Sequence, residues 1–553
     1  MGARRKIGAV TAAVAACALL AAACGRSANS AGSSAAGNVS ATGGLVTTTP
    51  AGTTKVPSVT WAVYRDVNTL DPIYAFDYPD NTGVTLMCES LLRQAPTGAL
   101  QPGLAAMSSP SPTQLVFTIK PGTKFWDGHP VTPADVVYSL DRNTNAKLGG
   151  FYGLVFSRVK SIQATGASQV TITLKQPDYW LPGELASMPG VIIEKSFAQQ
   201  QGKNYGTPAG AIMCTGAYMF KSFKPGVGVT AVVNPHYWNP SVKPLVGQIV
   251  VKGAPDISSL TSAMLTGGIQ GYYSSGGIPT LDQLTNSSSV KVYRGPGWST
   301  DAFIVSSFKG VLGDVRVRRA LSLALDRKGI ADSVYKGAAL QPRWLSNPGT
   351  FGYGKSVFNA AYNSSPVMTQ NLAEAKKLVQ QAGATGKTFT IGTSSQLADI
   401  SADAGAYQAA AQAIGLKAVL KSVSAQNYIN FFIDPKARQG IDGFLTVNYG
   451  DYADPAALLA TLVLPGASQN YANFNDPQIV SAMEQARGTA DPDKRAALVA
   501  QAEKLTMQQL PWIPDVQPVQ ILVLGKQLSG AVASFAYMFA PWANSLGGTH
   551  GSS

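Results

Sequence analysis

The chain has 553 residues, of which 45% are hydrophobic and only 13% charged, and its formal net charge at pH 7 is +13. This length exceeds one ordinary domain, so we expect two or three. The positive charge does not indicate a nucleic-acid partner, because the Lys and Arg residues are scattered and form neither a basic run nor a recognisable nucleic-acid-binding module.

Residues 1–24 have the pattern of an export signal. Three basic residues at 4–6 precede an apolar run over 7–23, and Cys24 follows. A basic start, a short apolar segment and small residues before a cleavage site are typical of secretory signals. Cys24 resembles the acylated cysteine of a bacterial lipobox, although Ala21 stands where leucine is usual. We predict a lipoprotein signal peptide with lipidation at Cys24; an ordinary cleaved signal is the alternative.

Residues 25–56 consist almost entirely of Gly, Ala, Ser, Thr, Asn and Val. Such a composition cannot bury a core, so we expect a flexible tether between the anchor and the folded part. Beyond the tether two cysteines remain, Cys88 and Cys214. In an exported protein an even pair indicates a disulfide, with two buried thiols as the alternative.

The stretch Leu115–Arg142 predicts a strand, a turn and a capped helix in succession. Apolar residues alternate over 115–119, which is the period of a half-buried strand. The Asp-Gly pair at 127–128 is a tight-turn signal, because glycine tolerates a positive φ. Thr132 can cap the helix that follows, and Asp135 stands three residues later, as in a capping box.

The second half of the chain predicts a parallel sheet. Asp314 can cap one amphipathic helix and Asn371 another. A strand over 388–393, a helix over 404–414 and a strand over 416–423 then follow. A helix between two strands of this length implies a parallel βαβ unit, which we expect to form the core of a second lobe.

Residues 124–140, K-F-W-D-G-H-P-V-T-P-A-D-V-V-Y-S-L, resemble the signature of the large extracytoplasmic solute-binding proteins of ABC importers, the oligopeptide/dipeptide/nickel-binding family. Similar stretches occur elsewhere in the order expected for that family: Thr69–Pro72, Gln101–Ala105, Asn234–Trp238, Asp314–Arg327, Asp451–Pro455 and Pro511–Pro514. One such stretch would be weak support, but an ordered set is strong support.

The resemblance implies an α/β bilobal fold like that of periplasmic binding proteins, with two crossover strands and a ligand cleft between the lobes. We expect lobe I over 57–297 and 516–545, lobe II over 298–515 and a disordered tail over 546–553. The implied function is capture of a peptide or peptide-like solute and its delivery to an ABC permease. We expect a monomer, lipid-anchored at the outer face of the bacterial cytoplasmic membrane, without enzymatic activity, cofactor, metal or nucleic-acid partner.

In peptide-binding members of the family, the first Asp of the motif Asp451–Pro455 binds the α-ammonium group of the ligand, and the resemblance implies this role for Asp451. The alternative is that Asp451 only caps the helix that follows. Asn448 replaces the usual Trp, which leaves the peptide class open. The resemblance and its flanking aromatic residues predict these ligand-binding residues: Asp451, Asn448, Tyr449, Phe76, Asp77, Tyr78, Trp298 and, for a ligand carboxylate, Arg343.

Other functions have less support in the sequence. Residues 349–356 match a P-loop pattern literally, but Ser-Asn-Pro precedes them where a buried strand is required. The three histidines form no metal-binding pattern, and we find no nucleophile elbow. The alternatives kept are a non-peptide solute such as a nickel chelate, haem or a sugar, an exported hydrolase, and a sensory lipoprotein.

Overall fold

The structure, a computed structural model, describes residues 44–254, 256–395 and 397–549. The predicted signal peptide, the predicted lipidation site Cys24 and the predicted tether up to residue 43 lie outside the described residues, as do residues 550–553. Within the described part, no helix combines the length and the apolar character needed to cross a bilayer.

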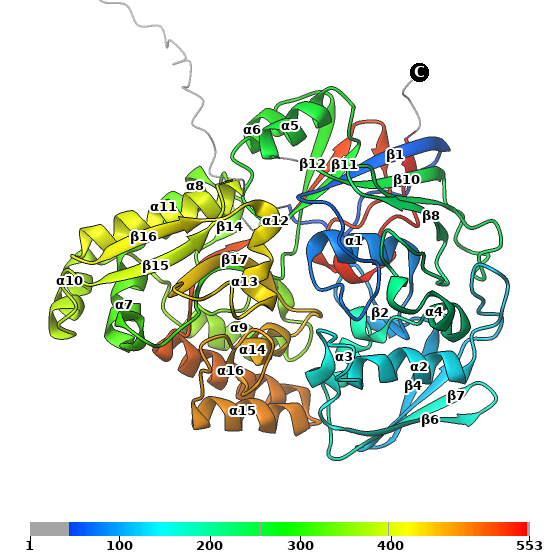
Figure 1. Cartoon of the computed structure of the whole chain (residues 1–553), viewed down its shortest axis with the longest axis horizontal. Coiled ribbons are helices and arrows are strands. Elements are labelled where there is room, and N and C mark those ends of the chain that lie inside the picture. Colours follow the sequence, from blue (N-terminus) through cyan, green and yellow to red (C-terminus); the bar gives the residue numbers. More distant parts are fainter. Residues whose placement is uncertain (1–43, 255, 396, 550–553) are drawn as a thin grey trace, which may run out of the picture. The chain divides into compact units, whose positions relative to one another are not determined.

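A seven-stranded sheet forms the centre of what we name lobe I (Figure 1). Its strand β1 runs parallel to both β10 and β11, while the remaining neighbours pair antiparallel. The strands in spatial order are β12 (Val290–Gly295), β19 (Gln520–Gly525), β11 (Gly271–Ser274), β1 (Val56–Val63), β10 (Val246–Gly253), β9 (Gly228–Val233) and β8 (Tyr218–Lys224).

A six-stranded sheet forms the centre of lobe II. The predicted βαβ unit is confirmed, because β15 pairs parallel with β16 and α11 (Ala398–Ala413) connects them. The strands in spatial order are β14 (Ala339–Leu340), β18 (Trp512–Pro518), β13 (Ser299–Val305), β17 (Gly443–Tyr449), β15 (Thr388–Thr393) and β16 (Lys417–Ser422). The longer helices of this lobe are α7 (Val315–Ala324), α9 (Lys355–Ser364), α10 (Leu372–Gln381), α14 (Pro455–Val463), α15 (Pro477–Gly488) and α16 (Pro492–Gln509).

Lobe I also contains a separate four-stranded antiparallel sheet with its own hydrophobic cluster, which the two-lobe prediction did not include. Its strands in spatial order are β4 (Ala105–Ser111), β5 (Gln114–Ile119), β7 (Gln169–Leu174) and β6 (Val159–Gly166). The helix α2 (Pro133–Thr144) packs beside it. Its predicted capping box is confirmed, because Asp135 N–H donates to Thr132 Oγ1 and Thr132 N–H donates to Asp135 Oδ2.

The chain crosses between the two large sheets twice, and the two crossings are neighbours. Residues 296–298 lead from β12 into β13, and Val519 leads from β18 into β19. The strands on both sides of the crossings are paired, β12 with β19 in lobe I and β13 with β18 in lobe II. The second crossing lies at Val519 and not at the expected 515/516 boundary, because β18 continues in the lobe II sheet as far as Pro518.

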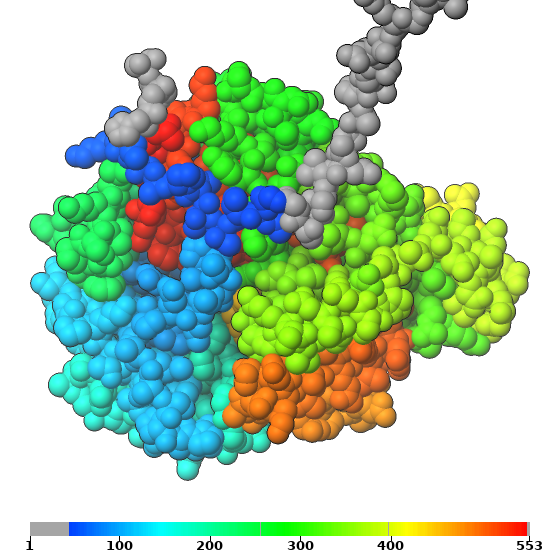
Figure 2. Space-filling view, turned by 180° about the vertical axis from the view of Figure 1, so that it is seen from behind, coloured from blue at the N-terminus to red at the C-terminus, as the bar shows by residue number. Residues whose placement is uncertain are grey.

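Both ends of the described chain differ from the expected boundaries. Thr48 pairs with Val532 and Thr54 with Gly548, so the described residues before β1, 44–55, belong to the folded body (Figure 2). Leu546 is buried, and the expected disordered tail instead contributes the short strand β21 (Gly547–Gly548). The expected tether and tail were extended too far into the folded part because they were predicted from a composition poor in apolar residues. Backbone hydrogen bonds hold these segments in place, and such bonds require no apolar side chains.

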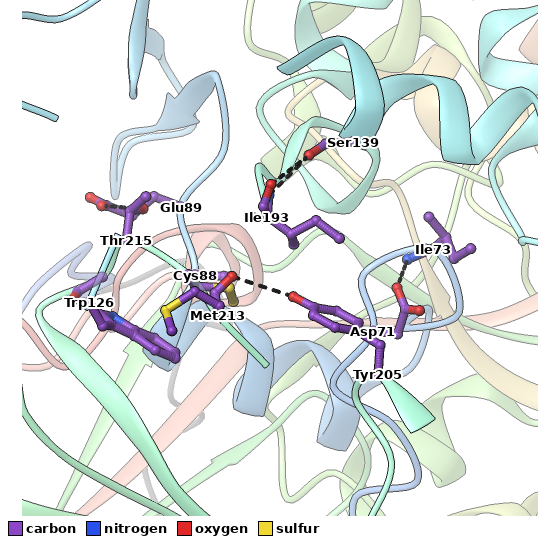
Figure 3. Close-up of a disulfide and its surroundings, with 12 residues drawn as sticks. Asp71, Ile73, Cys88, Glu89, Trp126, Ser139, Ile193, Tyr205, Met213 and Thr215 are labelled. Atoms are coloured by element: carbon purple, nitrogen blue, oxygen red, sulfur yellow. Dashed lines mark hydrogen bonds between the residues drawn. A yellow bond between two sulfur atoms is a disulfide. The ribbon is translucent and has the colours of Figure 1, made fainter. Parts of the chain in front are cut away.

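A disulfide joins Cys88, at the end of α1 (Tyr78–Met87), to Cys214, with a Cα–Cα distance of 5.0 Å (Figure 3). Beside it, half-buried Glu89 accepts hydrogen bonds from Thr215 Oγ1, Tyr237 Oη and Trp238 Nε1 at 2.7–2.8 Å. The stretch Asn234–Trp238, which carries part of the family resemblance, is therefore held in place by two hydrogen bonds to this carboxylate.

We expect replacement of both Cys88 and Cys214 by Ser to lower the free energy of unfolding by about 4–5 kcal/mol, because the bond closes a long loop in the unfolded chain. Urea unfolding followed by circular dichroism measures the change. The wild type under reducing conditions should then match the double variant. A double variant as stable as the oxidised wild type would show that the bond contributes nothing.

Candidate functional site

A cavity of about 190 Å³ lies between the lobes and is lined by both of them. Lobe I contributes residues of β1, α1, β11 and the loop after β11, and lobe II contributes α11, β17 and α12 (Ala425–Tyr428). The lining described by the structure is rich in aromatic side chains: Trp61, Tyr64, Phe76, Tyr78, Phe151, Tyr272, Tyr273, Tyr428, Phe432, Tyr449, Tyr471 and Tyr537. Such a wall offers large apolar faces with hydroxyl groups at their edges.

The lobe I wall is held rigid by aromatic stacking. The rings of Tyr273 and Tyr537 stack with centroids 3.6 Å apart, and Trp61 packs on Tyr273 at 4.8 Å. Phe76 stacks on Phe151 at 4.4 Å, with only 9° between the ring planes. These pairs fix the ring orientations before any ligand arrives, which reduces the entropy lost on binding.

Asp77 lies in the lining, but its charge is neutralised inside lobe I. Its side chain caps α1 by accepting the Tyr78 N–H at 2.8 Å. Its Oδ2 atom also accepts hydrogen bonds from Tyr64 Oη at 2.5 Å and from Arg65 Nη2 at 2.5 Å. Arg65 also contacts Asp80. Asp77 therefore organises the wall and does not present an unpaired anion to the cavity.

Direct hydrogen bonds connect the lobes next to the cavity. Tyr78 Oη in lobe I donates to Val447 O at 2.9 Å, and Tyr449 Oη in lobe II donates to Phe76 O at 2.7 Å. Gln94 Nε2 donates to Asp451 O at 2.7 Å. Each lobe thus offers a side-chain donor to the other lobe's backbone. Farther from the cavity, Arg487 of lobe II pairs with buried Asp178 of lobe I at 2.6 Å. The structure is therefore a closed state, and opening it requires these bonds to be exchanged for water.

Asn448 lines the cavity, and its amide hydrogen-bonds with the amide of Gln469, another lining residue. The structure thus brings five of the predicted ligand-binding residues to one cavity: Phe76, Asp77, Tyr78, Asn448 and Tyr449.

Asp451 is not among the lining residues of this cavity; it lies in the loop after β17, two residues past the lining residue Tyr449. Its carboxylate receives no hydrogen bond or ion pair from the described residues, and removal from water raises its pKa to about 7. Burial, with Asp451 nearby, likewise raises the pKa of Glu184. The helix-capping alternative is wrong for Asp451, because Asp454 caps α14 through the Ala456 N–H at 2.8 Å.

Trp298 and Arg343 are not brought to the cavity. Trp298 is buried at the first crossing, where its ring packs on Phe535 at 5.6 Å, so it serves the hinge. The Arg343 guanidinium donates to the carbonyl oxygens of Asn363 and Ser365 at the end of α9. A cation at a helix C-terminus stabilises the exposed carbonyls there, which accounts for Arg343 without a ligand.

Sequence reasoning missed the cavity residues at the end of β11 and in the loop after it, Tyr272–Gly277, as well as Asp399 and Tyr428. One usable signal was present, because Tyr-Tyr-Ser-Ser-Gly-Gly combines a strand end with a flexible polar loop, the usual place for binding residues. The contribution of α11 carries no local signal, since it depends on how the lobes meet.

Comparison with known proteins identifies the family. The profile of the bacterial extracellular solute-binding proteins, family 5, matches residues 99–470, more than half of the chain. The chain belongs to this family. The murein peptide-binding protein MppA of Escherichia coli K12 is 26% identical over 474 residues, covering 81% of this chain and 85% of MppA.

Solved structures show the same architecture. The binding protein DppA of Helicobacter pylori in complex with the peptide STSA has a TM-score of 0.79 at 20% identity, covering 90% of this chain and 98% of that one. AgaA of A. tumefaciens R10 in complex with agropinic acid has a TM-score of 0.78 at 20% identity, covering 90% and 99%. The predicted bilobal α/β fold is thereby confirmed.

The raised pKa of Asp451 predicts a stability effect. Between about pH 4 and pH 7 the unfolded chain has already ionised this group while the folded chain still holds the proton, so stability falls as pH rises. Asp451→Asn should therefore raise the melting temperature of the ligand-free protein at pH 8, by on the order of 1–2 °C, and change it little at pH 4.5. Scanning calorimetry at both pH values measures this, with Asp332→Asn as an exposed control. Equal effects at both pH values would contradict the assignment.

Proposed function

We propose that the protein captures a peptide or peptide-like solute outside the cytoplasmic membrane and delivers it to an ABC permease. The observation that carries the proposal is a cavity walled by both lobes, with hydrogen bonds between the lobes at its edge. A ligand that touches both walls stabilises the closed state over the open one, because it makes its full set of contacts only there.

Peptide ligands are favoured by the relatives. MppA and the oligopeptide-binding protein OppA of Escherichia coli K12 are each 26% identical to this chain over more than 470 residues, and both are named for peptide binding. The structural neighbours include proteins bound to a peptide and to agropinic acid. A non-peptide solute therefore stays as the second candidate, favoured by Asn448, which replaces the usual Trp of the peptide-binding motif.

We propose that Asp451 receives the α-ammonium of the solute. Its carboxylate has no partner among the described residues, and it follows directly on β17, which lines the cavity. An ammonium placed against it would form a charge-assisted hydrogen bond and would draw the pKa of the carboxyl group back down. Binding would thus release a proton near pH 6.

Capture requires no chemistry, and we propose that the protein is not an enzyme. The described lining contains no histidine that could act as a general base and no cysteine that could act as a nucleophile. Asp77 in that lining is already ion-paired with Arg65. We further propose that the chain acts as a monomer anchored through lipid on Cys24. Residues 25–43 would then act as the tether that lets the lobes reach a permease.

Calorimetric binding of free-amine peptides tests the proposal. We expect Asp451→Asn to weaken binding by at least about 30-fold, because loss of one partner of a buried charge pair typically costs 2–5 kcal/mol. Wild-type affinity should rise from pH 5.5 to pH 7.5 and then level off, since only the ionised carboxylate binds the ammonium. N-acetylated versions of the same peptides should bind the variant and the wild type alike.

Unchanged affinity in Asp451→Asn, with Asp332→Asn as the exposed control, would remove the anchor role. Failure of every free-amine peptide to bind the wild type would remove the peptide assignment.

A further inference from the structure

The charged side chains in the described part of the cavity wall are all acidic. The charged residues among its described lining are three carboxylates, Asp77, Asp256 and Asp399, with no Lys, Arg or His. This contrasts with the whole chain, in which 43 Lys and Arg residues outnumber 30 Asp and Glu residues. A ligand anion in this cavity would meet no cation, and desolvation of an unpaired anion is costly.

The three carboxylates differ in the hydrogen-bond and ion-pair partners that they already have within the protein. Asp77 is paired with Arg65, and Asp256 is exposed and caps α5 (Ile257–Leu265) through the N–H groups of Ser258 and Ser259. Asp399, in the first turn of α11, accepts the Ile400 N–H at 2.9 Å and has no ion pair with any described residue. Asp256 and Asp399 therefore both lack a cation among the described residues, and of these two Asp399 is the one that is partly withdrawn from water.

Asp399 lies where the lobes meet. Although it belongs to lobe II, its Oδ2 atom would be only 2.2 Å from a Cβ placed on Gly276 of lobe I. Only glycine leaves room for the carboxylate at that position. When the lobes are closed, the group is thus held against the loop after β11, partly withdrawn from water but still part of the cavity wall.

Asp399 is placed to attract a positively charged group of a ligand. Burial, followed by the nearby charge of Asp301, raises its pKa to about 6, so it is ionised at neutral pH. Asp301 in turn lies fully buried beside Asp403. Burial first, and then the charge of Asp399, raise the pKa of the phenol groups of Tyr272 from lobe I and Tyr428 from lobe II, so both side chains lie within electrostatic reach of this carboxylate, and both line the cavity. Aromatic faces attract cations and add to the attraction of a carboxylate.

We infer that the cavity selects solutes that carry a positively charged group, an ammonium or guanidinium, and that Asp399, Tyr272 and Tyr428 receive this group. The inference rests on the proposed function, because it takes the cavity as the solute site. It adds a second cationic position to the one assigned to Asp451 and predicts rejection of solutes with an anionic group at this position. A lysine or arginine side chain and a polyamine share the required chemistry.

The test compares three amidated tripeptides with free amino termini: Ala-Lys-Ala, Ala-norleucine-Ala and Ala-Glu-Ala. By calorimetry at pH 7.5, the wild type should bind the lysine peptide at least about 30-fold more tightly than the norleucine peptide, and the glutamate peptide more weakly still. Asp399→Asn should lose this preference while keeping the norleucine affinity. Asp332→Asn, which removes an exposed carboxylate of the same lobe, should behave as the wild type.

A parallel arm uses spermidine against tricarballylate, so that the inference does not depend on peptides. Peptides that bind without preference for lysine, or an Asp399→Asn variant that retains the preference, would overturn the inference and leave the proposed function intact. Spermidine binding that is lost in Asp399→Asn, without any peptide binding, would support the inference and contradict the peptide assignment. A wild type that binds neither the lysine peptide nor spermidine at 1 mM would overturn the inference.

Discussion

Two neighbouring chain crossings determine how the two lobes can move relative to each other. Pro296–Trp298 and Val519 connect strands that are hydrogen-bonded to each other in both large sheets. Asn347 ties the two crossings together, because its Nδ2 atom donates to Ser299 O at 2.9 Å and to Pro518 O at 3.0 Å. Gly297 permits the close approach, since a Cβ there would lie 2.1 Å from Pro518 O. The chain therefore joins the lobes through one narrow seam, about which we expect them to rotate.

This constraint explains why the cavity residues come from distant parts of the chain. Tyr78 and Tyr449 are far apart in the sequence, yet their rings lie 4.9 Å apart and each donates a hydrogen bond to the opposite lobe. The polar contacts at the edge of the cavity are few and involve backbone oxygen atoms, for which water can substitute. Away from the cavity the lobes are also joined by ion pairs, Arg487 with Asp178 at 2.6 Å and Arg158 with Glu484. A ligand in the cavity therefore adds its contacts to an interface that already favours the closed state.

Local features of the fold could be predicted from the sequence, and features that depend on lobe contact could not. The capping box of Thr132 and Asp135 and the βαβ unit of lobe II depend on short-range patterns and are present in the structure. Asp451 and Arg343 show the limit of this reasoning. The motif that contains Asp451 does not tell whether its carboxylate enters the cavity lining. Likewise, the sequence around Arg343 does not distinguish an arginine that binds helix-end carbonyls from one that binds a ligand carboxylate. Asp399 was missed because its role arises only when the lobes meet.

Closure about the seam is the central claim, and the distance between the lobes tests it most directly. Spin labels on cysteines introduced at the exposed positions Val227 in lobe I and Val419 in lobe II would report this distance by double electron–electron resonance, since Cys88 and Cys214 are already bonded to each other. We expect a broad distribution of longer distances without solute, which contracts to one shorter distance on saturation with a lysine-containing peptide or spermidine. An identical distribution with and without a bound solute would contradict capture by closure.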